Sequence, residues 1–136
     1  MDSNEFSITL PARCGSVTRV IDEVNSFAVS VGISKDTMDM IDVAIDEVCA
    51  NIVNYAYSAM PEPGSFTVKV SGDNSCLTLV FSDSGVPFNP LEVREPEFGS
   101  EPSEGGLGIF FCKNIMTGLS YRHAGGMNEL TMFKRI

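Results

Sequence analysis

The sequence predicts a two-layer α/β sandwich, an α+β fold in which helices cover one face of a mixed, mostly antiparallel sheet. Two stretches, 16–31 and 34–58, repeat apolar residues at steps of three and four and contain neither Gly nor Pro, which is typical of amphipathic helices. Later segments alternate apolar and polar residues around short turn sequences, which is typical of antiparallel hairpins. Residues 1–136 are therefore expected to form a single domain.

A strand and a helix are expected first. Residues 6–10 alternate apolar and polar side chains, which predicts a strand that ends at Pro11. Ser16 is expected to cap a helix that continues to about Val31, and Gly32 is expected to end it.

A long second helix is predicted from Ser34, a preferred N-cap residue, to Ser58. Three of its polar residues, Glu47, Asn51 and Asn54, fall within roughly 60° of one another at about 100° per residue. Such a stripe either faces water or lines a cavity with oxygen ligands suited to Mg²⁺. The helix alone leaves both interpretations open.

Two hairpins follow in the sequence. One joins strands at 66–70 and 77–81 through a Gly-Asp-Asn-Ser turn, and the other joins 119–123 to 130–136 through Ala-Gly-Gly. These turn sequences make antiparallel neighbours the expected arrangement.

An acidic segment separates the two hairpins. Residues 91–104 contain five Glu and two Pro and show no periodicity. A structureless loop of this length in a small domain is more often a functional lid than a passive linker, so a lid is predicted here. A helix from Ile109 to about Met116 is expected after it.

Composition narrows the possible functions. Nine basic residues against eighteen acidic ones give a net charge of −9, which argues against direct binding to nucleic acid. No apolar run is long enough for a membrane span, and no signal-peptide pattern is present near the first residue. The four cysteines form no Cys-x-x-Cys pair, which predicts reduced thiols, a cytoplasmic location and neither a disulfide framework nor a zinc site.

Two further motifs could contribute to a nucleotide site. Asp83 ends a predicted strand before Ser-Gly, where a carboxylate either forms an Asx turn or accepts a hydrogen bond from the exocyclic amine of adenine. The glycines of the segment 105–108 precede a helix, where free backbone N–H groups and the helix dipole favour phosphate. Each motif is a weak signal by itself.

Together the motifs are more specific, because their order and spacing resemble those of the Bergerat-fold, histidine-kinase-like ATPases. The segments that resemble the N, G1 and G2 boxes of that superfamily are Glu47-x-x-x-Asn51, Asp83-x-Gly85-x-Pro87-Phe88 and Glu104-Gly105-Gly106-Leu107-Gly108. Within the superfamily, the compact single-domain form and the C-terminal segment 130–135 resemble the bacterial anti-sigma factor/serine-protein kinases.

The resemblance implies a Bergerat-type ATP-binding fold and a role for each matching residue. Glu47 would be the catalytic general base, Asn51 would bind Mg²⁺ and Asp83 would contact the adenine amine. The other nucleotide-binding residues that it implies are Asn54, Gly85, Pro87, Gly105, Gly106, Leu107 and Gly108. Arg94 is the one basic residue that the predicted lid could offer to the γ-phosphate.

The resemblance also implies a function. It implies a cytoplasmic bacterial kinase that uses ATP and Mg²⁺, phosphorylates a serine of an anti-sigma factor antagonist and sequesters a sigma factor; it leaves a homodimer open and involves neither nucleic acid nor membrane. The alternative is a non-catalytic nucleotide-binding module that switches partners. Glu47 favours the kinase, whereas Tyr55, where the family commonly has His, and Asn89, where it commonly has Asp, favour the module.

Overall fold

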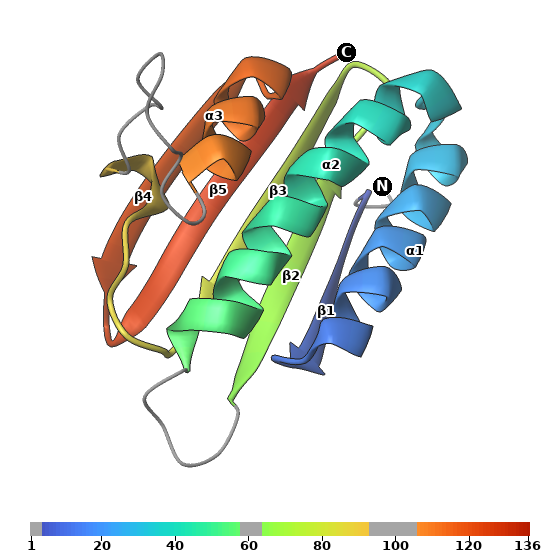
Figure 1. Ribbon diagram of the computed structural model, residues 1–136. Coiled ribbons are helices and arrows are strands. Elements are labelled where there is room, and N and C mark those ends of the chain that lie inside the picture. Colours follow the sequence, from blue (N-terminus) through green and yellow to red (C-terminus); the bar gives the residue numbers. More distant parts are fainter. Residues whose placement is uncertain (1–3, 58–63, 93–105) are drawn as a thin grey trace.

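The chain folds as a five-stranded sheet with helices packed on one face (Figure 1). A computed structural model describes residues 4–57, 64–92 and 106–136. The strand order is β1-β2-β3-β5-β4, and every pair of neighbouring strands is antiparallel. The two-layer sandwich is confirmed, and its described strands form a wholly antiparallel sheet where a mixed, mostly antiparallel one was expected. In chain order the elements are β1 (Glu5–Pro11), α1 (Cys14–Val31), α2 (Lys35–Asn51), the π-helix η1 (Ile52–Ala56), β2 (Ser65–Gly72), β3 (Cys76–Asp83), the 3₁₀-helix η2 (Pro90–Glu92), α3 (Gly106–Ile115), β4 (Gly118–Ala124) and β5 (Met127–Arg135).

The ends of the first helix are only partly as predicted. Gly32 ends α1 in the left-handed conformation, with φ of 86°, where glycine has no Cβ to clash. The helix begins at Cys14 rather than at a Ser16 cap, because the extended residue Arg13 already starts the first turn and the side chain of Ser16 is buried.

The second helix begins as predicted but changes type before its expected end. The Oγ of Ser34 accepts a hydrogen bond from the backbone N–H of Thr37 at 3.2 Å, so Ser34 is the N-cap. The predicted single helix to Ser58 is wrong in detail, because the α-helix ends at Asn51 and continues as the π-helix Ile52–Ala56. Residue 58 itself lies outside the described residues.

Tyr57 fixes the chain immediately after η1. Its buried ring carries a hydroxyl that donates to the carbonyl of Ser65 at 2.5 Å and accepts from the N–H of Ser84 at 3.0 Å. The ring also occupies the space above Gly64, where an added Cβ would come within 2.2 Å of it. Tyr57 therefore joins the end of η1 to the start of β2 and the end of β3.

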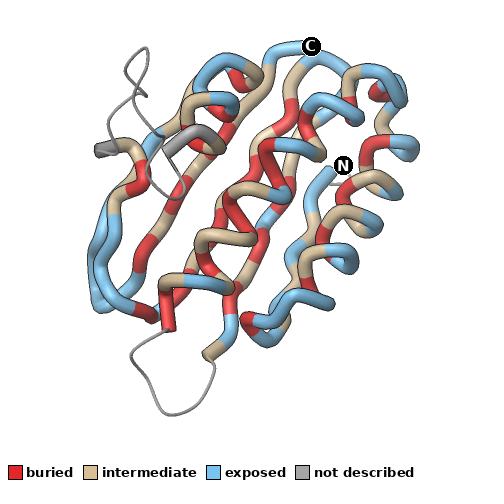
Figure 2. The backbone as a smooth tube through the Cα atoms, viewed as in Figure 1, coloured by how far each residue is buried: buried red, intermediate tan, exposed pale blue. Residues whose placement is uncertain are grey.

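The hydrophobic core lies between the helices and the inner face of the sheet (Figure 2). Burial of such apolar side chains stabilises the fold by about 1.5–3 kcal/mol for each large residue. The fully buried residues alternate along the strands, as the period-two pattern predicts, while the opposite sheet face carries mostly Ser, Thr and charged residues. Among the described helices, none is both long and apolar enough to cross a membrane.

Candidate functional site

A pocket opens where the C-terminal end of α2 and η1 meet the loop after β3 and the β4–β5 hairpin. The empty space in and in front of it, open solvent included, is about 440 Å³. Its walls are mostly apolar, and two of its polar residues, Asp83 at the end of β3 and Asn128 at the start of β5, are hydrogen-bonded to each other. Its lining residues are Val48, Asn51, Ile52, Ala56, Phe81, Asp83, Val86, Phe88, Pro90, Tyr121, Asn128 and Leu130. An apolar pocket with a few fixed polar groups suits a flat, partly polar ring such as a nucleobase.

Asp83 is the buried carboxylate of this pocket, with only 6% of its surface exposed. Its Oδ1 accepts hydrogen bonds from the backbone N–H of Gly85 and from the Nδ2 of Asn128, each at 2.9 Å. The Asx turn considered from the sequence is therefore present. Neither bond uses Oδ2, so the turn and a second role for this carboxylate are compatible.

Asn128 is a site residue that the sequence reasoning missed. Its Nδ2 donates to Asp83 and, at 3.0 Å, to the carbonyl of Val86, while its Oδ1 accepts from the N–H of Phe88 at 3.4 Å and from the hydroxyl of Tyr121. One buried amide thus fixes the end of β3, the following loop and β4. The sequence did contain a sign of its role. Asn128 falls on the inward-facing side of its strand, where the alternate residues are apolar, so a polar residue there is unusual.

Gly85 is required by the close approach of two backbone segments. A Cβ at Gly85 would lie 2.1 Å from the carbonyl oxygen of Ala56, the last residue of η1. The same carbonyl accepts a hydrogen bond from the N–H of Val86 at 2.8 Å. The glycine therefore lets the loop after β3 close against the helix, which forms one wall of the pocket.

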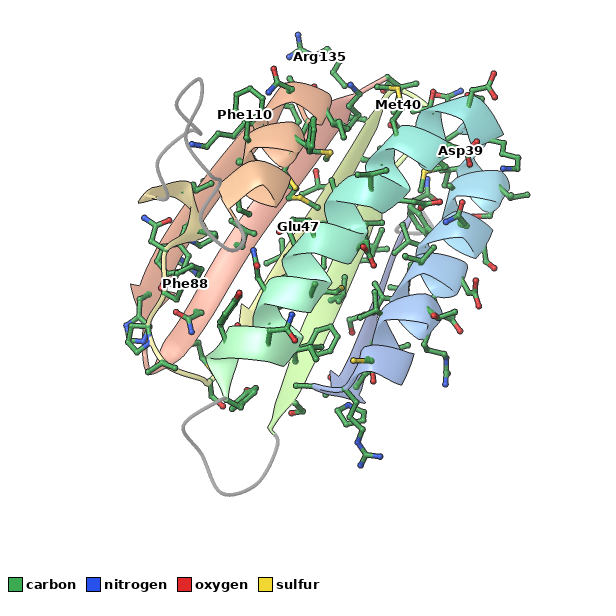
Figure 3. All side chains as sticks on the ribbon, in the orientation of Figure 1. Asp39, Met40, Glu47, Phe88, Phe110 and Arg135 are labelled. Carbon is green, nitrogen blue, oxygen red and sulfur yellow. The ribbon has the colours of Figure 1, made fainter. Side chains whose placement is uncertain are left out.

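Glu47 and Gly108 bring two of the sequence motifs together. A Cβ added to Gly108 would lie 1.8 Å from the Cδ of Glu47, so the carboxyl group occupies the space that this glycine leaves in α3. The two helices run in opposite directions here, since the thiol of Cys112 lies 3.7 Å from the carbonyl of Ala44, one turn before Glu47 on α2. Figure 3 shows Glu47 midway along α2.

The environment of Glu47 favours its protonated form more than water does. Partial burial raises the pKa of the carboxyl group, and the charge of the neighbouring Asp46 raises it further. Burial likewise raises the pKa of Cys112 to about 12, with the charge of Glu47 as the second cause. A raised carboxyl pKa is a property of catalytic acids and bases, although structural burial produces it too.

The two asparagines of the predicted stripe separate. Asn51 lines the pocket, one turn after Glu47. Asn54 is exposed and is not among the lining residues, because η1 has a wider turn than the α-helix on which its position was predicted. The structure therefore places Asn51 in the pocket wall, one turn after Glu47, and leaves Asn54 exposed.

The glycine-rich segment forms the beginning of α3. The helix starts at Gly106, three residues earlier than predicted, so Gly106, Leu107 and Gly108 make its first turn, where backbone N–H groups lack helical partners. Gly105 and most of the predicted lid, with Arg94, lie outside the described residues, and the lid stays a prediction.

The residues that depart from the family pattern have clear structural roles. Asn89 accepts a hydrogen bond from the N–H of Leu91 at 2.9 Å through its Oδ1, an acceptor that Asp also provides, and so starts η2. Tyr55 packs its ring 6.2 Å from that of Phe88, which lines the pocket. Pro87, which precedes Phe88, is not among the lining residues.

Mg²⁺ would need ligands beyond the protein at this site. Among residues 4–57, 64–92 and 106–136, no group of three or more His, Cys, Asp or Glu side chains gathers to hold a metal ion. Mg²⁺ commonly binds through one or two protein oxygens together with substrate phosphates and water. The side-chain oxygen of Asn51, which lines the pocket, fits this limited contribution.

Comparisons with known proteins bear on the family and the fold of this chain. A family model described as a histidine kinase-like ATPase domain matches residues 10–134. The serine-protein kinase RsbW of Bacillus mycoides is 26% identical over 135 residues, which cover 93% of this chain and 82% of that protein. RsbW of Halalkalibacterium halodurans is 28% identical over 129 residues, with coverages of 90% and 78%.

A solved structure supports the fold. A crystal structure of the RsbU and RsbW domains of a Mycobacterium tuberculosis protein matches with a TM-score of 0.65 at 17% identity. The match covers 96% of this chain and 32% of that longer chain, so the chain spans about a third of its length.

Proposed function

The chain belongs to the histidine kinase-like ATPase domain family, and on that premise we propose that it is a serine-protein kinase of the anti-sigma factor type. It would bind Mg-ATP, transfer the γ-phosphate to a serine of an anti-sigma factor antagonist and sequester a sigma factor in a bacterial cytoplasm. The names of the similar serine-protein kinases support the reaction class. The observation that carries the proposal is the arrangement of four residues beside α2. Asp83 and Asn51 line one pocket, Glu47 lies one turn before Asn51, and its carboxyl group lies against Gly108. We call this line of residues the seam.

Adenine would occupy the pocket end of this seam. Asp83 holds its Oδ1 in fixed hydrogen bonds, which leaves Oδ2 as the oxygen to accept from the exocyclic amine. Guanine carries a carbonyl at that point, and its oxygen would face the acceptor oxygen of Asp83, which favours ATP over GTP.

The phosphates would follow α2 from Asn51 toward Glu47. Asn51 would give a neutral oxygen to Mg²⁺, and the first-turn N–H groups of α3 at Gly106 and Gly108 would face the phosphate oxygens. The chain has a net charge of −9, so its own residues offer little positive charge to the phosphates, and Mg²⁺ would neutralise part of the phosphate charge.

Glu47 would act as the general base. Its carboxylate would take the proton of the acceptor serine as the serine Oγ forms its bond to the γ-phosphorus and the bond from that phosphorus to the bridging oxygen of ADP breaks. Because Gly108 has no side chain, the carboxyl group can lie against α3, and this placement would supply the positioning that such a transfer needs.

A non-catalytic partner-switching module remains the second candidate, favoured by Tyr55 where the family commonly has His. Glu47 separates the two functions. In a kinase, Glu47→Gln should leave the Mg-ATP dissociation constant within about twofold while phosphotransfer falls roughly 10²–10⁴-fold.

The experiment incubates the purified chain with Mg-ATP and a purified antagonist and maps phosphoserine on the antagonist by mass spectrometry. Transfer by the wild-type chain supports the kinase. Binding of Mg-ATP and of the antagonist with no phosphoserine would establish the silent module instead. Full transfer by Glu47→Gln would still support the proposed kinase function, but it would show that another residue is the general base.

A further inference from the structure

An apolar patch continues the seam beyond Glu47. Met40 and Val43, each 52% exposed, and Phe111, 48% exposed, are large apolar side chains on α2 and α3. We call these three residues the seam patch. Met40, Val43 and Glu47 fall within about 60° of one another around α2, so they share one side of that helix. Figure 3 shows Met40 nearer the beginning of α2 than Glu47.

Helix α3 places Phe111 at the same level along the seam as Val43 of α2. Because α2 and α3 are antiparallel, Gly108 lies opposite Glu47 and Cys112 lies opposite Ala44, the residue after Val43. Phe111, which immediately precedes Cys112, therefore lies at the level of Val43 along the seam. The patch begins where the proposed path of the phosphates ends.

The exposed charged residues of α2 near the patch are mostly acidic, whereas α3 carries the exposed Lys113 two residues after Phe111. Asp36, Asp39 and Asp46 are exposed on α2, and Lys35 pairs with Asp39 at 2.9 Å. A partner that covers the patch would meet apolar contacts beside Glu47 and negative charge around them. A segment with an apolar side chain and flanking basic residues is complementary to this surface.

We propose that the seam patch is the docking surface for the serine-bearing segment of the antagonist protein. This inference rests on the proposed kinase function and names the place where its protein substrate binds. An apolar side chain of the antagonist covers Val43 and Phe111, basic side chains of the antagonist face the acidic residues of α2, and the acceptor serine reaches Glu47. Docking at this place positions the hydroxyl at the phosphate end of the seam without contacting the adenine pocket.

The test measures steady-state transfer from Mg-ATP to the purified antagonist that the wild-type chain phosphorylates. Val43→Glu and Phe111→Ser should each raise the KM for the antagonist at least about tenfold, because they remove apolar anchors at the centre of the contact. The kcat and the KM for ATP should stay within about twofold. Val29→Glu is the matched control, because Val29 is an apolar residue that is 78% exposed and lies on α1, away from the patch. This variant should keep the wild-type KM for the antagonist.

Charge provides a second readout. The KM of the wild-type chain for the antagonist should rise with ionic strength, and Asp36→Asn combined with Asp39→Asn should reduce that dependence. Circular dichroism melts of every variant verify that the fold is retained.

The outcomes separate this inference from the proposed function. Suppose that the wild-type chain transfers phosphate. If Val43→Glu and Phe111→Ser both keep the wild-type KM for the antagonist, or if Val29→Glu raises this KM equally, the proposed docking surface is wrong and the proposed kinase function stands. If the wild-type chain transfers no phosphate to any antagonist, the kinase and the docking surface fall together.

Discussion

Replacing Gly108 by Ala tests the contact between α3 and Glu47 more sharply than removing either carboxylate oxygen. The new Cβ would lie 1.8 Å from the Cδ of Glu47 and 2.1 and 2.2 Å from its two oxygens. Ordinary contacts between such atoms need about 3.4 Å or more, so the carboxyl group must move by roughly 1.5 Å. A displacement of about 1 Å at a reacting group can lower the rate about 10²-fold.

Stability should respond differently from the rate. The displaced group is the flexible end of a half-buried side chain, and Ala is favoured over Gly inside a helix by roughly 0.5–1 kcal/mol. Gly108→Ala should therefore fold with a free energy of unfolding within about 1 kcal/mol of wild type, while phosphotransfer falls on the order of 10²-fold. Gly15→Ala is the matched control, because a Cβ at Gly15 in α1 meets nothing within 4 Å.

A double-mutant cycle decides whether the loss passes through Glu47. Transfer rates are measured for Gly108→Ala, Glu47→Gln and the double variant at saturating Mg-ATP. If Gly108→Ala acts by moving the carboxylate, it should add little to the loss caused by Glu47→Gln. Full transfer by Gly108→Ala, or a loss that adds in full to that of Glu47→Gln, would show that Gly108 does not position the Glu47 carboxylate.

Three further variants test the remaining parts of the site. Asp83→Asn should weaken ATP binding by about 1–3 kcal/mol, roughly 5–150-fold, and reduce the preference over GTP in calorimetric titrations; equal wild-type affinities for the two nucleotides would exclude adenine reading. Asn51→Ala should weaken nucleotide binding in Mg²⁺ but change it little in excess EDTA, and an equal loss in both would remove the metal role. Glu47→Gln should melt at a higher temperature than wild type at pH 7 and at a similar one near pH 4. Burial raises the pKa of the folded carboxyl, so the favourable contribution of its protonated form is lost as the pH rises through that pKa. Equal melting temperatures at pH 7 would show that the charge is not destabilising.

Local chemistry in the sequence was sufficient to predict most of the fold. The N-cap at Ser34, the left-handed Gly32 and the hairpin turns each depend on a few neighbouring residues, and the structure confirms them. The π-helix was not predictable from the same signals, because residues 52–56 continue the apolar period without a Gly or Pro. Its far end is set by distant contacts, namely Gly85 against Ala56 and the hydroxyl of Tyr57 on β2.

The site shows the same division. The motif order singled out Glu47, Asn51, Asp83 and the glycines of α3, and the structure brings Glu47 against Gly108 and puts Asn51 and Asp83 on one pocket. The prediction for Asn54 assumed the turn of about 100° per residue of an α-helix, and the π-helix changes that angle, so Asn54 does not line the pocket. The strand pattern of Asn128 showed only that it faces inward; its partners Asp83, Val86 and Phe88 are 40 or more residues away in sequence, and strand pairing is what brings it beside Asp83.

A crystal structure of the chain with Mg²⁺ and a non-hydrolysable ATP analogue would test the central claim most directly. The expected result places the adenine amine on the carboxylate of Asp83, Mg²⁺ on the side-chain oxygen of Asn51 and the terminal phosphate between Glu47 and the first turn of α3. A nucleotide bound away from Asp83, or one whose terminal phosphate points away from Glu47, would contradict the proposed seam and the reaction assigned to it.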